Sequence, residues 1–323
     1  MKSLAVSQLR QQPALFVSIG LVVVIFLVGK VGISGFGGPQ TFKAVLLLAT
    51  FLGIAAAGQT IVIILGGIDL SIPFVVGAAN VAVAKLYGDG VPFVAAVAIA
   101  LVGAALFGML NAAISVSSNV HPLLVTLGTG TALLGAIQLW TNGLPTGGGP
   151  EWLTSFVAIG SSTGPIPIAP VVIFWLVLAV VVIVVLRFST FGRRLYAMGN
   201  SPRAAELALV RKLPTWLSAF GASSVFAALG GILLLGFTGT AFAGVGERYL
   251  FLSIGAVVIG GTLITGGKGG YLGTVIGALT ITLLTTVFTG FGFNGSVQQV
   301  IMGVVIVLMV AVYGRDQDVR NRV

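Results

Sequence analysis

The stretch KAVLLLATFLGIAAAGQTIVIILGGID, residues 43–69, decides the class of this protein, because 25 uncharged residues separate Lys43 from Asp69. A bilayer core about 30 Å thick is crossed by roughly 20 mainly apolar helical residues. The whole chain shares this character: of its 323 residues 57% are hydrophobic and 7% are charged, and its mean hydropathy is +1.14. Since soluble domains carry about 25% charged residues, a water-soluble globular protein is excluded.

The distances between successive charged residues predict the number of membrane crossings. Long uncharged gaps separate Arg10 from Lys30, Lys43 from Asp69, Asp69 from Lys85, Asp89 from Glu151, Glu151 from Arg187, Lys212 from Glu247, Arg248 from Lys268 and Lys268 from Arg315. Two of these gaps hold two helices each, because turn-forming clusters at 117–122 and 294–296 divide them. We therefore expect an all-α, polytopic bundle of about ten transmembrane helices, with one transmembrane domain over residues 1–323.

The cations predict the orientation, because Lys and Arg concentrate in cytoplasmic loops. With both termini in the cytoplasm, the expected inside cations are Lys2, Arg10, Arg187, Arg193, Arg194, Arg203, Arg211, Lys212, Lys268, Arg315, Arg320 and Arg322. The expected outside cations are only Lys30, Lys43, Lys85 and Arg248. This bias explains the formal net charge of +9, so nucleic acid is not expected as a partner. No small-x-small cleavage pattern precedes Lys30, and the first helix is expected to be retained.

Residues for catalysis or metal binding are scarce. The chain has no cysteine, one histidine and seven acids, which excludes thiolate metal sites, disulfides and cysteine nucleophiles. Asp89, Glu151 and Glu247 are expected outside the membrane, away from any helix interior. We expect no metal site and no enzymatic activity in this chain.

The first interruption of the apolar pattern lies at residues 58–73. Two glycines end one apolar run there, and Asp69, Ser71 and Pro73 are residues that begin a helix. One interpretation is a capped turn within the membrane. The alternative is a substrate or gating role for Asp69, the only acid close to a membrane core.

The second interruption is the glycine-rich stretch at 253–274, which includes Lys268. It is not a Walker A phosphate loop, because Thr262 stands where the first glycine belongs and Gly269 follows the lysine. Like residues 58–73, it joins an apolar run, a Gly-Gly pair, a short polar stretch and a small-residue helix. This similarity favours a weak internal repeat, which we expect to be inverted as in many transporters.

The third interruption is the longest cytoplasmic loop, residues 188–213. Ser201 is a good N-cap with Pro202 behind it, and Pro214 closes the stretch, so a short helix is expected on the cytoplasmic face. This helix is interpreted as a docking surface for a soluble subunit. The alternative is a positively charged linker with one helical turn.

Four motifs, in this order and spacing, carry a family resemblance over most of the chain. They are GGIDLS at 66–71, HPLLVTLGT at 121–129, GRRLYAMGN at 192–200, and AVVIGGT at 256–262 followed by Gly266 and Gly267. With them the chain resembles the membrane permease subunit of ribose-type carbohydrate ABC importers.

The resemblance implies a permease of about ten helices in the bacterial inner membrane. It implies three protein partners: a second permease copy or paralogue in a dimer, an extracytoplasmic sugar-binding protein, and a separate cytoplasmic ATPase that holds ATP and Mg. This chain itself is expected to bind no cofactor. The loop at 188–213 resembles the coupling segment that meets the ATPase, with candidate residues Arg193, Arg194, Ser201, Pro202, Glu206 and Leu207.

Sugars are neutral and rich in hydroxyl groups, so their path needs hydrogen-bonding groups. The candidates are Gln59, Asp69, Ser71, Asn111, Thr126 and Thr129. For the two threonines the alternative role is hydrogen bonding between helices or back to their own helix.

The chain departs from the family pattern at Pro73 and Leu209, where glycine is common, and at residues 249–253, which lack a common acid. These departures leave the sugar open among a pentose, a hexose, a polyol and a furanosyl signalling molecule. A branched-chain amino acid ABC permease is the nearest alternative. A secondary carrier is less favoured, because it needs paired ionisable residues within its helices.

Overall fold

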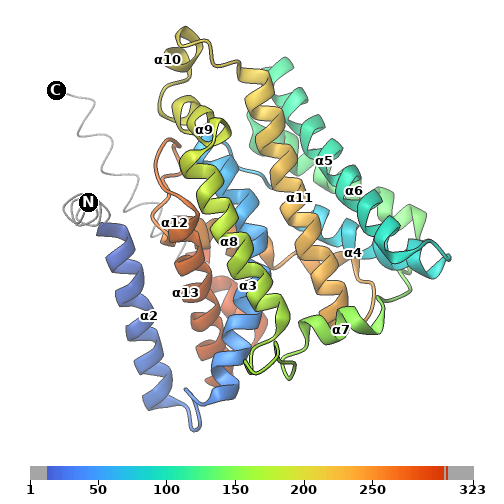
Figure 1. Ribbon diagram of the computed structural model, residues 1–323, viewed down its shortest axis with the longest axis vertical. Coiled ribbons are helices and arrows are strands. Elements are labelled where there is room, and N and C mark those ends of the chain that lie inside the picture. The colour runs from blue at the N-terminus through green and yellow to red at the C-terminus, as the bar shows by residue number, and fades with distance from the viewer. Residues whose placement is uncertain (1–12, 302, 305–323) are drawn as a thin grey trace.

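Helices form the whole regular framework of the part of the chain that the structure describes (Figure 1). The computed structural model describes residues 13–301, 303 and 304. The helices are α2 (Pro13–Gly32), α3 (Pro39–Leu65), α4 (Ile72–Gly88), α5 (Phe93–Ser117), α6 (Pro122–Trp140), α7 (Glu151–Val157), α8 (Pro170–Phe188), α9 (Thr190–Asn200), α10 (Pro202–Leu207), α11 (Lys212–Thr238), the 3-10 helix η1 (Ala243–Gly246), α12 (Tyr249–Ile259) and α13 (Tyr271–Gly290). Within these residues the only β pairing is an isolated bridge between Thr163 and Ile166. The all-α expectation is confirmed.

Six of the described helices are long and apolar enough to cross a membrane: α3, α5, α6, α8, α11 and α13. Two shorter apolar helices cover 17–32 and 72–88. The expected count of ten crossings is not confirmed, and neither is the inverted repeat. Of the cations used for the orientation, Lys2, Arg10, Arg315, Arg320 and Arg322 lie outside the described residues.

The gap between Arg248 and Lys268 does not hold a helix long enough to cross a membrane. Its helix α12 has 11 residues, which at about 1.5 Å per residue span roughly 16 Å, half of a bilayer core. The Gly260–Gly261 pair ends the helix, because Gly261 adopts φ +82°. The rest of the gap is the glycine loop, residues 260–270, which is not helical.

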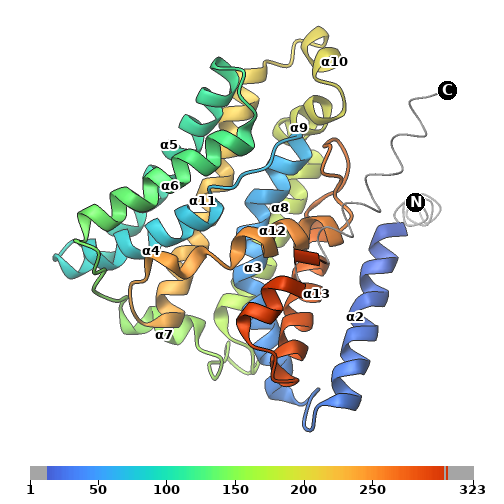
Figure 2. The same ribbon diagram turned by 180° about the vertical axis from the view of Figure 1, so that it is seen from behind.

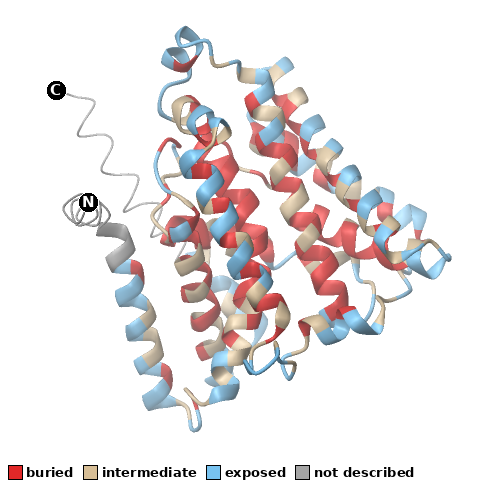
Figure 3. Ribbon diagram, viewed as in Figure 1, coloured by how far each residue is buried: buried red, intermediate tan, exposed pale blue. Residues whose placement is uncertain are grey.

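The core of the bundle is built around α3 and α11. In the most apolar 18-residue window of each helix, 94% of the residues of α3 and 72% of those of α11 are buried. In α6 the buried share is only 17% (Figure 3). Glycines let the central helices approach backbone to backbone: a Cβ placed on Gly58 of α3 would lie 2.7 Å from the Ser223 Cα of α11. Gly231 of α11 lies in the same way against the Val76 backbone of α4.

Replacing Gly231 by Val tests this close packing. The new side chain would meet the Val76 backbone, and overpacking of this kind costs about 1–3 kcal/mol of unfolding free energy. Gly103→Val is the matched control, because no atom lies within 4 Å of a Cβ at this exposed α5 position. We expect a lower thermal midpoint in detergent for Gly231→Val only; equal midpoints for the two variants would contradict the packing account.

Candidate functional site

Asp69 lies in the turn between α3 and α4 and is almost fully buried, with 2% of its surface exposed. Gly66 ends α3 in the left-handed conformation, with φ +93°. Asp69 Oδ1 accepts hydrogen bonds from the Ser71 backbone N–H at 2.9 Å and from Ser71 Oγ at 2.5 Å. No side chain caps the N-terminus of α4. Asp69 therefore shapes the turn ahead of α4 instead of capping the helix.

The second carboxylate oxygen is held by a residue that the sequence interpretation missed. Ser223 Oγ of α11 donates to Asp69 Oδ2 at 2.7 Å, across 154 positions of the chain. Ser223 and Ser224 form a Ser-Ser pair inside a long apolar run, which is the one sequence feature that could have identified them. The contact ties the buried turn to the central helix α11.

Hydrogen bonds extend from this turn to α5 and α6. Asn111 Nδ2 of α5 donates to Ser71 Oγ at 3.3 Å. Asn111 Oδ1 accepts a hydrogen bond from Thr129 Oγ1 of α6 at 2.6 Å. The Leu70 backbone N–H donates to Thr126 Oγ1 at 3.0 Å. The structure thus brings together five of the six predicted path residues and adds one. The polar network consists of Asp69, Ser71, Asn111, Thr126, Thr129 and Ser223.

Both threonines also bond to their own helix, as the alternative role predicts. Thr126 Oγ1 donates to the Pro122 carbonyl at 2.9 Å, and Thr129 Oγ1 lies 2.9 Å from the Val125 carbonyl. Thr126 fills both roles, because its hydroxyl donates once and still accepts from Leu70. The single Thr129 proton serves either Asn111 or Val125.

Gln59, the sixth predicted path residue, does not join the network. It lies within α3 with no exposed surface, and neither its amide nitrogen nor its amide oxygen has a hydrogen-bond partner among the described residues. Ser224 Oγ and Ser115 Oγ are buried without a partner in the same way. Because an unpaired buried polar group costs about 1–3 kcal/mol, these groups can gain from a hydroxylated solute or a water molecule.

The network contains one formal charge and no cation. An ion pair joins Lys85 Nζ to Asp89 Oδ2, 3.1 Å apart at the far end of α4 and away from the network. The Asp69 carboxylate is stabilised instead by two hydroxyl groups and one backbone N–H. Such an arrangement suits hydrogen bonding with neutral hydroxyl groups better than binding of an anion.

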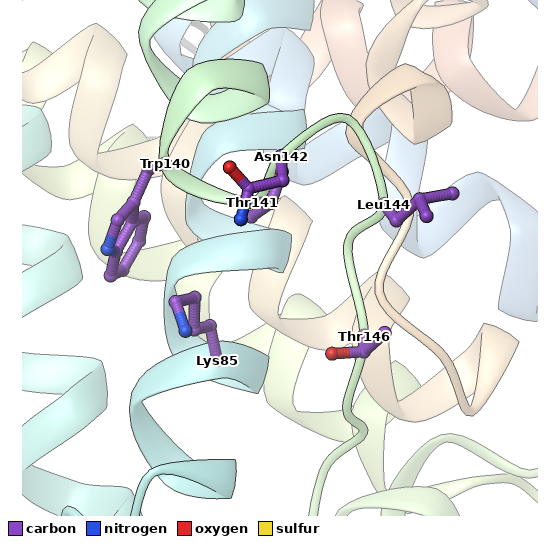
Figure 4. Close-up of a pocket in the computed structure, with 6 residues that line it drawn as sticks. All are labelled: Lys85, Trp140, Thr141, Asn142, Leu144 and Thr146. Carbon is purple, nitrogen blue, oxygen red and sulfur yellow. The ribbon is translucent and has the colours of Figure 1, made fainter.

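A polar pocket lies at that far end, about 20 Å along α4 from the network at 1.5 Å per residue. Its volume is about 210 Å³, and its lining residues are Lys85, Trp140, Thr141, Asn142, Leu144 and Thr146 (Figure 4). Lys85 Nζ lies 5.6 Å from the centre of the Trp140 ring. This pocket is separate from the network.

The predicted cytoplasmic segment forms two short helices, α9 and α10. Ser201 Oγ accepts from the Ala204 N–H at 3.3 Å and Pro202 is the first residue of α10, so the expected helix start is confirmed. Pro214, which is expected to close the stretch, lies instead in the first turn of α11; α10 ends at Leu207, and Leu209 after it adopts φ +60°. A glycine there would avoid this strain, which gives a physical reason for the family preference at this position.

The candidate coupling residues lie on the surface of these helices. Arg193, Arg194, Ser201, Pro202, Glu206 and Leu207 are all exposed. The side chains of Leu207 and Leu209 are 82% and 89% exposed. Figure 1 shows α10 at one end of the molecule, beyond the ends of the long helices. This placement leaves the segment free to contact another protein.

The segment also touches the backbone that leads to Asp69. Gly199 of α9 lies directly against the Ile64 carbonyl of α3, and the Gly267 N–H donates to the same carbonyl at 2.9 Å. Tyr196 Oη donates to the Gly269 carbonyl at 2.9 Å. Helix α9, the glycine loop and the last turn of α3 therefore form one contact region, five residues before Asp69.

Ser223→Ala tests the hydrogen bond to the buried carboxylate. It leaves one Asp69 oxygen without its donor, which costs about 1–3 kcal/mol of unfolding free energy. Ser224→Ala is the matched control, because Ser224 Oγ has no partner among the described residues. We expect the unfolding midpoint to fall for Ser223→Ala and to stay near wild type for Ser224→Ala; the reverse order would show that Ser223 does not hold the carboxylate.

Comparison with known proteins supports a transport role. Residues 41–310 match the family described as branched-chain amino acid transport system / permease component. The "Autoinducer 2 import system permease protein LsrD" of Escherichia coli strain K12 is 31% identical over 277 residues, which cover 84% of this chain and 82% of the relative. The proteins of the same name from Escherichia coli strain SMS-3-5 and from Shigella flexneri show the same identity and coverage. No solved structure matches.

Proposed function

The chain belongs to the family of branched-chain amino acid transport system permease components, and we propose that it is the membrane permease of an ATP-driven ABC importer for a monosaccharide. The family makes the chain a transport subunit, which confirms the permease resemblance. The observation that carries the sugar proposal is the polar network, which joins hydroxyl, amide and carboxylate groups inside an otherwise apolar bundle.

The chemistry of the network favours a sugar over an amino acid. A zwitterionic amino acid presents a carboxylate, which needs a cation or several N–H donors. No described Lys or Arg forms an ion pair with Asp69, and the other network members are neutral. Relatives named as autoinducer 2 import permeases agree with a solute other than an amino acid. A branched-chain amino acid is the alternative that the family description supports.

ATP hydrolysis is assigned to a separate cytoplasmic ATPase that contacts α9 and α10. In this proposal closure of the ATPase pushes α9 against the glycine loop and the last turn of α3. The displacement then reaches Asp69 through Gly66 and Gly67, and α11 carries it to Ser223. Rearrangement of the Asp69–Ser223 contact would open a path that the described conformation keeps closed.

The distribution of cations supports cytoplasmic termini and an inner-membrane location. Arg187, Arg193, Arg194, Arg203, Arg211, Lys212 and Lys268 lie on or next to α9, α10 and the glycine loop. Lys30, Lys43 and Lys85 lie at the other ends of their helices. By the positive-inside tendency, the α9 face is cytoplasmic. A sugar-binding protein would then deliver the solute to the opposite face, and a second permease copy or paralogue would complete the path.

Reconstituted uptake tests the proposed function. Proteoliposomes would hold this chain, its co-encoded ATPase and its binding protein, with labelled pentoses, hexoses and leucine outside. We expect ATP-dependent uptake of a sugar that disappears without the binding protein. Uptake of leucine alone would move the assignment to amino acids, and uptake that persists without the ATPase but collapses with an ionophore would overturn the ABC mechanism.

Glu206→Arg combined with Leu207→Arg tests the coupling segment. Both side chains are exposed, so the change should spare folding while it removes an apolar contact and reverses a charge. We expect less ATPase to co-purify at unchanged membrane insertion. The control variant, Glu151→Arg combined with Leu144→Arg, also replaces one exposed Glu and one exposed Leu by Arg, but outside α9 and α10. It should not affect co-purification. An unchanged ATPase yield for the first variant would refute this assignment.

Asp69→Asn tests whether the negative charge is needed for transport. Asn retains an acceptor for both Ser71 bonds, and Ser223 can rotate to accept from the new amide. The fold should therefore survive. The variant loses the charge-assisted hydrogen bond between the Asp69 carboxylate and a sugar hydroxyl, which is worth about 1.5–3 kcal/mol. Sugar uptake should therefore fall about tenfold or more at normal expression. Wild-type uptake would show that Asp69 only shapes the turn.

A further inference from the structure

A second polar cluster lies in the segment between α11 and α12, outside the polar network. The segment follows α4 closely: the Phe242 N–H donates to Asn80 Oδ1 at 2.9 Å, the Ala243 carbonyl lies against Gly77, and Gly246 lies against the Pro73 carbonyl. It therefore runs along α4 from Asn80 back to the first turn, next to Ser71 of the network.

This path carries two charged residues to a level midway along the bundle. Glu247 and Arg248 come directly after Gly246 and are exposed. Pro73 lies 12 positions before Lys85, about 18 Å along α4, and the Lys85–Asp89 ion pair lies at the far end of that helix. On the other side, α12 separates Arg248 from the glycine loop by roughly 16 Å. Figure 2 shows α12 and α4 midway between α9 and α7.

Charged side chains at this depth need water or a partner. Ionisable groups within a membrane face a protein interior or a water-filled cavity, because lipid does not solvate them. Neither Glu247 nor Arg248 forms an ion pair with any residue that the structure describes. Their exposure therefore indicates an aqueous surface. Such a surface within the bundle differs from the loop outside the membrane in which the sequence places both residues.

An aromatic ring joins the charges at this surface. Phe242 is 59% exposed. A Cβ placed on Gly244 would lie 2.9 Å from Phe242 Cζ and 3.1 Å from Glu247 Oε1, so the ring and the carboxylate flank the bare glycine. The ring offers an apolar face for C–H groups, and the two charged groups offer strong hydrogen bonds to hydroxyl groups. The combined charge is zero, which suits a neutral solute.

We propose that Phe242, Glu247 and Arg248 form a solute-binding site for a neutral polyhydroxylated molecule, the monosaccharide in transit, at mid-depth beside the polar network. The inference rests on the proposed function. The carboxylate accepts from sugar hydroxyls, the guanidinium donates to them, and the ring covers the apolar face of the sugar. Gly244 leaves the space between ring and carboxylate.

Cysteine labelling tests the aqueous surface directly, because the chain contains no native cysteine. The Glu247→Cys and Arg248→Cys permeases would be placed in lipid discs and treated with a charged, membrane-impermeant thiol reagent. The rate at which each cysteine reacts would be measured. Glu151→Cys provides an exposed control, and Val180→Cys, on the outer surface of α8, provides a lipid-facing control. We expect both test positions to react at the rate of the exposed control. Rates as low as that of Val180→Cys would overturn the proposal and indicate coverage by lipid or by a second permease copy.

Protection by sugar tests the ligand class. D-ribose, D-xylose and D-glucose would be added separately to the Ala243→Cys permease, whose reporter lies between Phe242 and Gly244 and which retains Phe242, Glu247 and Arg248. Since only free sites react, at least one sugar at more than about twice its Kd should slow labelling about threefold or more. Glu247→Gln in the same background should abolish this protection, and Glu151→Cys should show none. Protection by leucine and by none of the sugars, or by no solute, would overturn the site.

Transport kinetics provide a third readout in the complete importer. Glu247→Gln and Arg248→Gln should raise the KM for sugar uptake, while Glu151→Gln should leave it unchanged. An unchanged KM in both test variants would contradict the site. Failure of sugar uptake by the wild-type importer would overturn the proposed function, whereas cysteine labelling needs no transport and judges the aqueous surface separately.

Discussion

The burial of one carboxylate constrains the rest of the structure. An ionised group inside an apolar bundle is costly unless hydrogen bonds satisfy its oxygens. Asp69 meets this requirement with Ser71 from its own turn and Ser223 from α11, and Asn111 and Thr129 extend the bonds to α5 and α6. Four parts of the bundle are therefore fixed relative to one another by a single buried turn. The same bonds place the polar groups of the proposed path at one level of the molecule.

Close backbone contacts connect this turn to the exposed end of the molecule. Gly199 of α9 and Gly267 of the glycine loop both meet the Ile64 carbonyl, at the last turn of α3. Side chains at these glycines would separate the elements, so in the proposed mechanism a displacement would pass through backbone contacts instead of flexible side chains. Helix α11 starts just after α10 and carries Ser223 in its middle. In the proposed mechanism, movement of α9 and α10 thus has two routes to the Asp69 carboxylate.

Much of this arrangement follows from the sequence, and the rest depends on long-range packing. Uncharged runs longer than 20 residues predict membrane helices, and Asp69 stands out in the sequence as an acid between two uncharged runs with no cation beside it. Ser201 and Pro202 predict the start of α10. By contrast, the length of α12 depends on the left-handed conformation of Gly261, and the end of α10 depends on that of Leu209. The contact of Ser223 with Asp69 spans 154 positions, and the approach of Glu247 to α4 depends on Gly246 and Gly77, so no local pattern identifies either.

The most direct test of the link between coupling segment and buried turn is hydrogen exchange on the assembled importer in lipid discs. Amide exchange at residues 62–75 would be compared with and without a non-hydrolysable ATP analogue on the ATPase. The account predicts that exchange changes both in α9 and at residues 66–71, since one backbone contact region joins them. A change in α9 without any change at residues 66–71 would contradict it.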